Sequence, residues 1–341
     1  MGRPVRRGLV ALAIAVVFLV AAAPSCGGGG GGTTTTAQTT TTARSTTTAR
    51  STTSSTDAPT TTTPPPSLAA PCGRTATPPA AYDHVVVMVE ENRTWTGGRT
   101  APVGLGFSAS TMPFLHGLAA QCAYYTDWVE TNGTQNSLNQ YIGMTSGVAN
   151  PSTVNDCVPS VTCHSTDDNL FRQVRVGGGT QRTYVDGATT ACSAGPNAAK
   201  HIPALYYWGG DDRAHCAAEV RPLSELDPDH LPTLSFVVPD LCHDGHDCSD
   251  TVTDSFARTT LAPILDGADY RAGKTLVVVV YDEDQPVPNL LIAPTAHAGA
   301  ISSVAGSHAS LLKTIEQVLG LPVMNQGQLP SAISLRSTAH L

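Results

Sequence analysis

The chain has 341 residues, a net charge of −8 at pH 7 and nine cysteines. Its lysine and arginine residues form no basic stripe, which argues against nucleic acid as a partner, and they provide no polybasic patch for an anionic membrane surface. The part that is expected to fold, residues 71–341, has the size of a single α/β domain.

The first 26 residues are typical of a secretory signal. Three arginines among the first seven residues precede an apolar stretch from Leu9 to Ala23, which is too short to span a bilayer comfortably. Cys26 follows small residues, as in a bacterial lipoprotein cleavage box, although Ala23 stands where leucine is usual. We therefore expect export, either as a secreted protein or as an envelope lipoprotein anchored to the membrane through Cys26.

Residues 27–70 consist of glycine, followed by threonine, serine and proline with almost nothing apolar. A segment of this composition cannot bury a core, so we expect a disordered stalk. The folded domain is expected to begin near residue 71.

The cysteines also indicate an exported protein. Once Cys26 is set aside, eight remain, and an even number in an exported chain indicates disulfide bonds. The spacing suggests three local pairs and one remaining pair, although sequence alone leaves the connectivity open. These pairs are Cys157–Cys163, Cys192–Cys216, Cys242–Cys248 and Cys72–Cys122.

The apolar segments, taken in chain order, predict an α/β domain. Core strands are expected at residues 84–89, 233–238, 275–281 and 290–293. Helical spacing of apolar residues indicates helices at residues 112–122, 137–146, 167–176 and 308–319. Strands that alternate with helices predict a three-layer α/β/α sandwich with a mostly parallel central sheet. Residues 180–229 are interpreted as an insertion over the carboxyl edge of this sheet.

Two of the predicted strands end in acidic residues. Glu91 and Asn92 follow the first strand, and the sequence Asp282-Glu283-Asp284 follows the third. By itself the first pair favours a turn, since Asn92 tolerates unusual backbone angles. Three adjacent acids after a buried strand repel one another unless a cation lies among them. Because open α/β sheets bind ligands at their carboxyl edge, both strand ends together predict one divalent-metal site.

Serine and histidine residues supply further candidates. Ser137 begins a predicted helix, where it would act either as an N-cap, with Asn136 as the alternative cap, or as a nucleophile among amide dipoles that favour phosphate. His246 lies between Cys242 and Cys248, a spacing that suits a zinc knuckle or, in an exported protein, a small disulfide loop.

The order of several short motifs adds a resemblance to a known family. The motifs are the first strand with Glu91-Asn92, then Met112-Pro113-Phe114-Leu115, Asn136-Ser137-Leu138 with Tyr141, Lys200-His201 with Pro203 and Tyr206-Tyr207, Pro239-Asp240-Leu241-Cys242 with His246-Asp247-Cys248, Asp282-Glu283, and the segment from His308 to Pro322. Over about residues 82–322 the chain resembles the bacterial phosphoesterase family that contains secreted acid phosphatases and phospholipases C, which is related to the alkaline phosphatase superfamily.

This resemblance implies an alkaline phosphatase-like sandwich and a metal-dependent phosphatase. A divalent cation would be held by Glu91, Asn92, Ser137, Asp282 and Glu283. Ser137 would attack phosphorus in line and form a phosphoseryl intermediate that water later hydrolyses. The catalytic histidines would be His201 and His246, which bind phosphoryl oxygens or protonate the leaving alcohol. Substrate would also contact His308 and the amides of Asn139 and Gln140.

The sequence departs from the family pattern near the predicted nucleophile. Gln135 stands where the family usually has histidine, and Asn139-Gln140 stands where it usually has Pro-Asn. The link at residues 285–288 is short and lacks the histidine that often follows the acidic strand end.

The expected function is an exported acid phosphatase that acts on phosphomonoesters. Its substrates would be soluble esters or phosphoinositide headgroups. The alternatives are a phosphodiesterase of the phospholipase C type and a catalytically impaired surface binding protein on the same scaffold.

Overall fold

A computed structural model describes residues 70–94, 106–130, 136–153, 155–324 and 332–341. The predicted signal, the predicted stalk up to residue 69 and Gln135 lie outside these ranges. Within them, no helix combines the length and the apolar character that crossing a bilayer requires.

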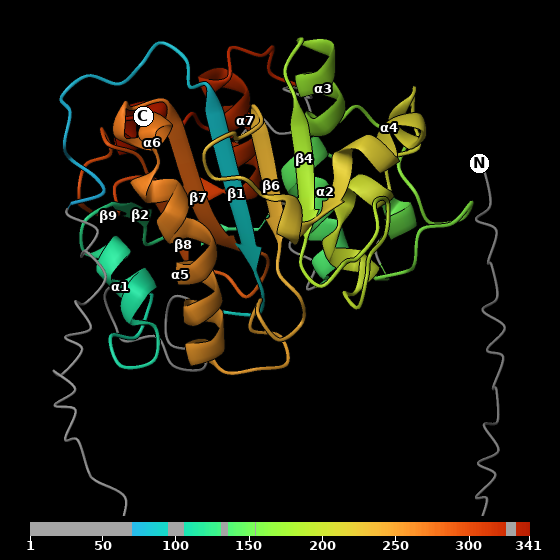
Figure 1. Ribbon diagram of the computed structural model, residues 1–341, viewed down its shortest axis with the longest axis horizontal. Helices are drawn as coiled ribbons and strands as arrows, with labels where there is room; N and C mark the ends of the chain where they lie inside the picture. Colours follow the sequence, from blue (N-terminus) through green and yellow to red (C-terminus); the bar gives the residue numbers. More distant parts are fainter. Residues whose placement is uncertain (1–69, 95–105, 131–135, 154, 325–331) are drawn as a thin grey trace, which may run out of the picture. The chain divides into compact units, whose positions relative to one another are not determined.

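An eight-stranded sheet forms the centre of the folded domain (Figure 1). Its strand order is β5-β4-β6-β1-β7-β8-β2-β9. Every neighbouring pair is parallel except the two that involve β8, so the sheet is mostly parallel as predicted. The strands are β1 (His84–Glu90), β2 (Ala123–Tyr125), β4 (Gln181–Val185), β5 (Val220–Pro222), β6 (Leu234–Val238), β7 (Thr275–Tyr281), β8 (Asn289–Ile292) and β9 (Gly299–Ile301).

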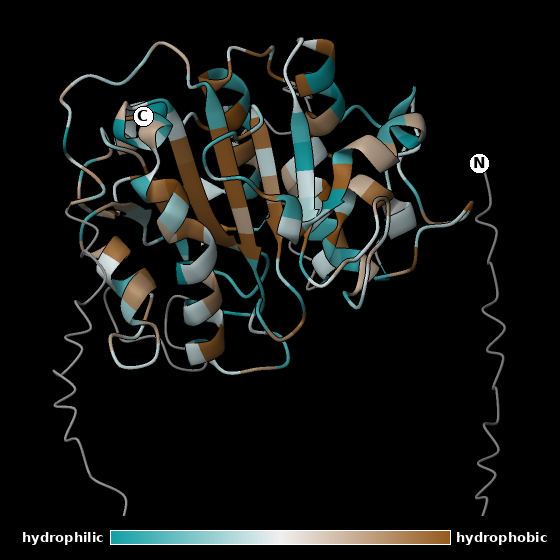
Figure 2. Ribbon diagram, in the orientation of Figure 1, coloured by the Kyte–Doolittle hydropathy of each residue, from teal (hydrophilic) through white to brown (hydrophobic). Residues whose placement is uncertain are grey.

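The central strands are apolar on both faces because helices cover both. All seven residues of β7 are buried, and β1 is buried from its second residue to its end. Figure 2 shows this hydrophobic character along β1 and β7. Continuous β-branched runs of this kind are typical of parallel strands between two helix layers.

The helices form two groups (Figure 1). On one face α2 packs against α7 and α3, and on the other α5 packs against α1 and α6. The bounds are α1 (Pro113–Ala119), α2 (Ser137–Ser146), α3 (Leu170–Val176), α5 (Asp250–Asp266), α6 (Ala268–Arg271) and α7 (His308–Val318). The predicted α/β/α sandwich is therefore confirmed.

Short elements complete the domain. Two further helices are α4 (Asp212–Glu219) and α8 (Arg336–Ala339), and four 3-10 turns are η1 (Pro151–Thr153), η2 (Ala199–His201), η3 (Pro203–Leu205) and η4 (Leu223–Glu225). A small parallel sheet joins β3 (Trp128–Val129) to β10 (Gly306–Ser307).

The prediction for residues 180–229 is wrong in part. The segment does not simply cover the sheet, because β4 and β5 extend the sheet beside β6. The residues between these strands, which include α4, and the residues after β5, which include η4, lie outside the sheet. The strands were missed because β4 carries glutamine, arginine and threonine in place of a continuous apolar run.

Four disulfide bonds connect the eight remaining cysteines in the suggested pairs, which are Cys72–Cys122, Cys157–Cys163, Cys192–Cys216 and Cys242–Cys248. The last pair excludes both of its cysteines as zinc ligands. The loop that it closes holds His243, Asp244 and His246 close to the ends of the strands.

Glu316 on α7 gives a prediction about folding. Its side chain is fully buried, and burial raises the pKa of its carboxyl group to about 7. Because the folded-state pKa lies above the unfolded value, this group binds its proton more tightly in the folded state. Its contribution to stability is therefore present at low pH and is lost as the pH rises toward 7.

We expect Glu316→Gln to change little at pH 4.5 and to increase the free energy of unfolding by about 2 kcal/mol relative to the parent at pH 8. Urea denaturation at the two pH values measures this difference, with the exposed Glu225→Gln as a control. An equal change in the free energy of unfolding at both pH values would show that folding does not raise the pKa of Glu316.

Candidate active site

Strand register brings the first two candidate residues together. In the β1–β7 pairing Glu90 lies opposite Tyr281, so the next residues, Glu91 and Asp282, leave the sheet side by side. Both side chains are fully buried. The backbone N–H groups of Asn92 and Glu283 donate to Asp282 Oδ1 at 3.2 Å and 2.7 Å, which fixes that carboxylate.

Ser137 lies at the first turn of α2 and faces these carboxylates. The N-cap of α2 is Asn136, whose side chain accepts a hydrogen bond from the Asn139 N–H, so the hydroxyl of Ser137 is not used as the cap. That hydroxyl donates to Glu91 Oε2 at 3.2 Å. It also accepts a hydrogen bond from Lys200 Nζ at 3.1 Å. A serine between a carboxylate and an ammonium group is arranged as a nucleophile would be.

Lys200 is a candidate functional residue that the sequence patterns did not identify. Its ammonium group lies 3.5 Å from Asp156 Oδ2 as well as next to Ser137. Asp156 Oδ1 accepts a hydrogen bond from the Leu138 N–H, so Asp156 connects Lys200 to the start of α2. The only sequence signal for Lys200 was its place directly before His201 in a recognised motif.

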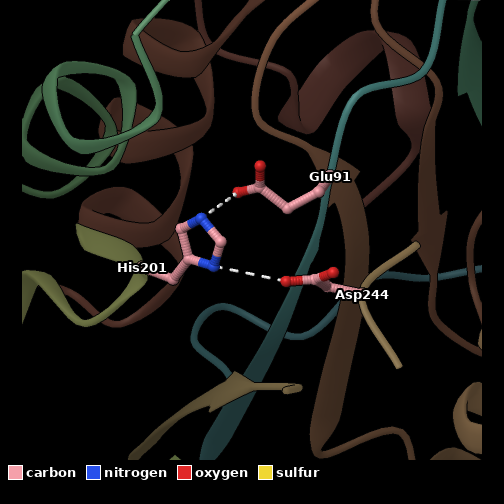
Figure 3. Close-up of side chains that lie close together, drawn as sticks. All are labelled: Glu91, His201 and Asp244. Atoms are coloured by element: carbon pink, nitrogen blue, oxygen red, sulfur yellow. Dashed lines mark ion pairs between the residues drawn. The ribbon is translucent and has the colours of Figure 1, made fainter. Parts of the chain in front are cut away.

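His201 lies between two buried carboxylates (Figure 3). Its Nε2 is 3.0 Å from Glu91 Oε1, and its Nδ1 is 3.2 Å from Asp244 Oδ2. Its ring stacks on Tyr141, whose hydroxyl donates to Glu91 Oε1 at 3.1 Å. Asp244 and Tyr141 were not predicted as site residues, because only the fold brings the Cys242–Cys248 loop and α2 to the end of β1.

The electrostatics of this group favour a cation. Burial, followed by the nearby charge of Asp282, raises the pKa of Glu91 well above its usual value, and burial also raises the pKa of Asp282. Burial together with Asp282 and Asp284 raises the pKa of Glu283 to about 8. These shifts show that the negative charges are poorly solvated and repel one another.

The donor atoms also fit a divalent cation. Asp282 Oδ2 and Glu283 Oε2 are buried and accept no hydrogen bond from the described residues. Carboxylate, hydroxyl and amide oxygens are the ligands that hard divalent cations prefer. Glu91, Ser137 and Asp282 are in place for such an ion, with Asn92 and Glu283 adjacent.

Two further groups of side chains could hold a metal ion. Donor atoms of Glu91, His201 and Asp244 lie within 4.8 Å of one another, and so do those of Asp186, Asp240 and His243. The first group is buried and shares Glu91 with the carboxylate pair. The second is partly exposed, and its His243 Nδ1 lies 2.6 Å from Asp186 Oδ2.

His246 and His308 occupy different environments. His246 is partly exposed, its Nδ1 lies 2.7 Å from Asp247 Oδ1, and its ring centroid is 6.2 Å from that of His201. His308 is fully buried, with Nδ1 accepting from Trp128 Nε1 at 3.2 Å and Nε2 at 2.6 Å from the Asp282 backbone carbonyl. Burial lowers the pKa of His308 to about 4, so the ring is neutral and supports Asp282 through its backbone.

The two amide candidates on α2 are buried. Gln140 Nε2 donates to Glu130 Oε2 at 3.3 Å, and Glu130 Oε1 accepts from the Gln285 N–H at 3.1 Å. Gln140 therefore links α2 to the turn that carries Asp282. Asn139 is held in the first turn of α2 by its backbone bond to Asn136.

Comparison with known proteins places this sequence in a family. The sequence profile of the Phosphoesterase family matches residues 97–322. The chain belongs to the Phosphoesterase family. The predicted resemblance is thus confirmed, although the match begins after Glu91 and Asn92 and includes the other members of the predicted site.

The chain is also similar to individual proteins. The chain is 28% identical over 261 residues to a phosphatidylinositol-3-phosphatase of Mycobacterium tuberculosis. The alignment covers 73% of this chain and 81% of that protein. Among solved structures, a Vibrio parahaemolyticus protein of the alkaline phosphatase superfamily has a TM-score of 0.48 at 11% identity, covering 72% and 68% of the two chains. A phosphonate monoester hydrolase of Agrobacterium radiobacter has a TM-score of 0.43 at 12% identity, covering 70% and 74%.

Proposed function

We propose that this phosphoesterase is an exported, metal-dependent phosphatase that hydrolyses phosphate monoesters with Ser137 as its nucleophile. The observation that carries the proposal is the placement of the Ser137 hydroxyl between Glu91 and Lys200, with the buried carboxylate of Asp282 also within its reach. The relative that is named a phosphatidylinositol-3-phosphatase supports phosphatase activity and makes phosphoinositides candidate substrates.

Ser137 is activated by the groups that already contact it. Its hydroxyl proton points to Glu91 Oε2, and the ammonium group of Lys200 stabilises negative charge that develops on Oγ. Attack on phosphorus expels the alcohol and leaves a phosphoseryl group that water then hydrolyses. A divalent cation held by Glu91, Asn92, Ser137, Asp282 and Glu283 would neutralise charge on the phosphoryl oxygens.

The remaining side chains divide between proton transfer and support. We assign protonation of the leaving alcohol to His246, because its ring is partly exposed and Asp247 orients it through Nδ1. His201 holds Glu91 and Asp244 in place, and His308 holds the backbone of Asp282. These proposed support roles differ from what the resemblance implied, which was phosphoryl binding or proton transfer for His201 and substrate contact for His308. Asn139 and Gln140 maintain the start of α2.

Export is supported by the disulfide bonds. Four bonds in one domain are typical of an oxidising compartment outside the cytoplasm. Secretion by the N-terminal segment and lipid attachment at Cys26 belong to the same proposal. Intact-mass analysis of protein from the cell envelope tests the attachment, since an unmodified mass would exclude it.

Phosphate release tests the proposed activity. We expect the purified protein to release phosphate from phenyl phosphate between pH 4 and 8, to lose at least about 90% of this activity after chelation, and to regain it with one of Mg²⁺, Mn²⁺, Ca²⁺ or Zn²⁺. Diphenyl phosphate is the control substrate. Faster cleavage of the diester would identify a phosphodiesterase, and cation and phosphate binding without turnover would identify a binding protein.

A further inference from the structure

A separate cavity of about 440 Å³ lies among the segments next to Ser137. Its volume falls within the range of small-molecule sites, which are mostly apolar with a few placed polar groups. The walls come from the Cys157–Cys163 loop, the segment around residues 192–208 and α4. The lining includes Val158, Ala194, Ala199, Leu205, Trp208 and Arg213.

Disulfide bonds hold the walls of this cavity in place. Cys192 and Cys216 both line it and are bonded to each other, which ties α4 to the segment before η2. Val158 lies directly after Cys157, which is bonded to Cys163. A cavity with cross-linked walls loses little conformational entropy when a ligand enters it.

One charged group faces this apolar cavity. The guanidinium carbon of Arg213 lies 4.2 Å from the ring centroid of Trp208, and His164 also stacks on that ring at 4.7 Å. The two acids before Arg213, Asp211 and Asp212, pair with arginines of α3. Among the described residues no carboxylate forms an ion pair with Arg213. The cavity therefore combines an aromatic wall with a cation that is free to meet an anion.

Two residues that line the cavity are close in the chain to residues that contact Ser137 or Lys200. Ala199 precedes Lys200, whose ammonium group contacts Ser137 Oγ, and Val158 is two residues from Asp156, which pairs with Lys200. Chain geometry places the Cα atom of Ala199 at most roughly 13 Å from Ser137 Oγ. An extended substrate whose phosphate lies at Ser137 is long enough to reach this wall with its alcohol portion.

We propose that this cavity is a subsite for the leaving alcohol, and that it selects phosphate esters whose alcohol carries an apolar ring and a second negative charge. The ring packs against Trp208 and the neighbouring aliphatic side chains, and the second anion pairs with Arg213. This inference rests on the proposed phosphatase activity, and it specifies the class of substrate that the same site prefers.

Three aryl phosphates with similar leaving groups test the proposal. Phenyl phosphate reaches only Ser137, 4-biphenylyl phosphate adds an apolar ring, and 4′-carboxy-4-biphenylyl phosphate adds the ring and an anion. We expect kcat/KM to rise about tenfold with the second ring and about tenfold again with the carboxylate.

Two variants separate the parts of the subsite. Arg213→Gln, at an exposed position, should remove the gain from the carboxylate and keep the gain from the ring. Ala194→Phe should fill the cavity and remove both gains. Neither should change kcat/KM for phenyl phosphate by more than about twofold. Arg271→Gln, an exposed arginine on α6, is the matched control and should behave as the parent does.

A binding measurement separates failure of the subsite from failure of the proposed activity. The alcohol 4′-hydroxybiphenyl-4-carboxylate should bind the parent, measured by calorimetry, about tenfold more tightly than it binds Arg213→Gln. If the parent does not hydrolyse phenyl phosphate, the proposed phosphatase activity is wrong. The binding measurement would still show whether the cavity binds the alcohol. The proposed subsite would be wrong if the parent and Ala194→Phe bound the alcohol equally tightly. It would also be wrong if the parent had the same kcat/KM for all three esters.

Discussion

Ser137→Ala is expected to lower kcat for phenyl phosphate at least about a thousandfold, because it removes the hydroxyl oxygen that we propose forms the covalent intermediate. The substitution deletes a single buried hydroxyl group, and Glu91 and Lys200 keep their other contacts, with Tyr141 and Asp156 respectively. The expected effect on folding is therefore small. Steady-state kinetics and a thermal melt measure the two effects separately.

The same helix offers a control for this substitution. Ser146 is also buried on α2, and its hydroxyl donates to the Ile142 carbonyl at 2.8 Å, away from Glu91. Ser146→Ala should retain kcat within about threefold. If Ser137→Ala kept more than about a tenth of the parent kcat, water would have to attack phosphorus directly, and the assignment of the nucleophile would be wrong.

Asp282→Asn is expected to have opposite effects on stability and on metal binding. Burial raises the pKa of Asp282, so its ionised form destabilises the metal-free fold at pH 7. The new amide can still accept hydrogen bonds from the Asn92 and Glu283 N–H groups. We expect the metal-free variant to be more stable than the metal-free parent by about 1–3 kcal/mol.

The same substitution should weaken divalent-cation binding at least about a hundredfold and abolish phosphate release. Equilibrium dialysis followed by metal analysis gives the affinity, and urea denaturation in chelator gives the stability. Asp284→Asn, in the same turn, is the control and should change the cation affinity by less than about threefold. A variant that is less stable without metal and still binds the cation would show that Asp282 is a structural acid.

The sequence predicted the parts of this fold that have strong local patterns. The apolar runs of β1 and β7 are buried on both faces and need only local composition to be recognised. By contrast, α5 was missed, although its buried positions recur at helical spacing, because that stripe includes Asp250, Thr253 and Thr260. A hydropathy pattern cannot identify a buried face whose members are polar.

The candidate site shows the same limit. Glu91 and Asp282 were predicted to meet because both follow parallel strands, and the register of β1 and β7 places them side by side. Asp244 and Lys200 were not assigned roles, since their approach to Glu91 and Ser137 depends on loops that cross from other parts of the chain. For His308 the motif indicated a substrate contact, but the structure buries the ring and keeps it neutral. The sequence pattern alone does not show this burial.

Trapping the covalent intermediate tests the central claim most directly. The metal-loaded protein would be mixed with excess phenyl phosphate, quenched in acid within the first turnovers, and digested for peptide mass analysis. The account predicts one added phosphoryl group on Ser137, present in the parent and absent from Ser137→Ala. A phosphoryl group on His201 or His246, or active protein that never carries one, would contradict it.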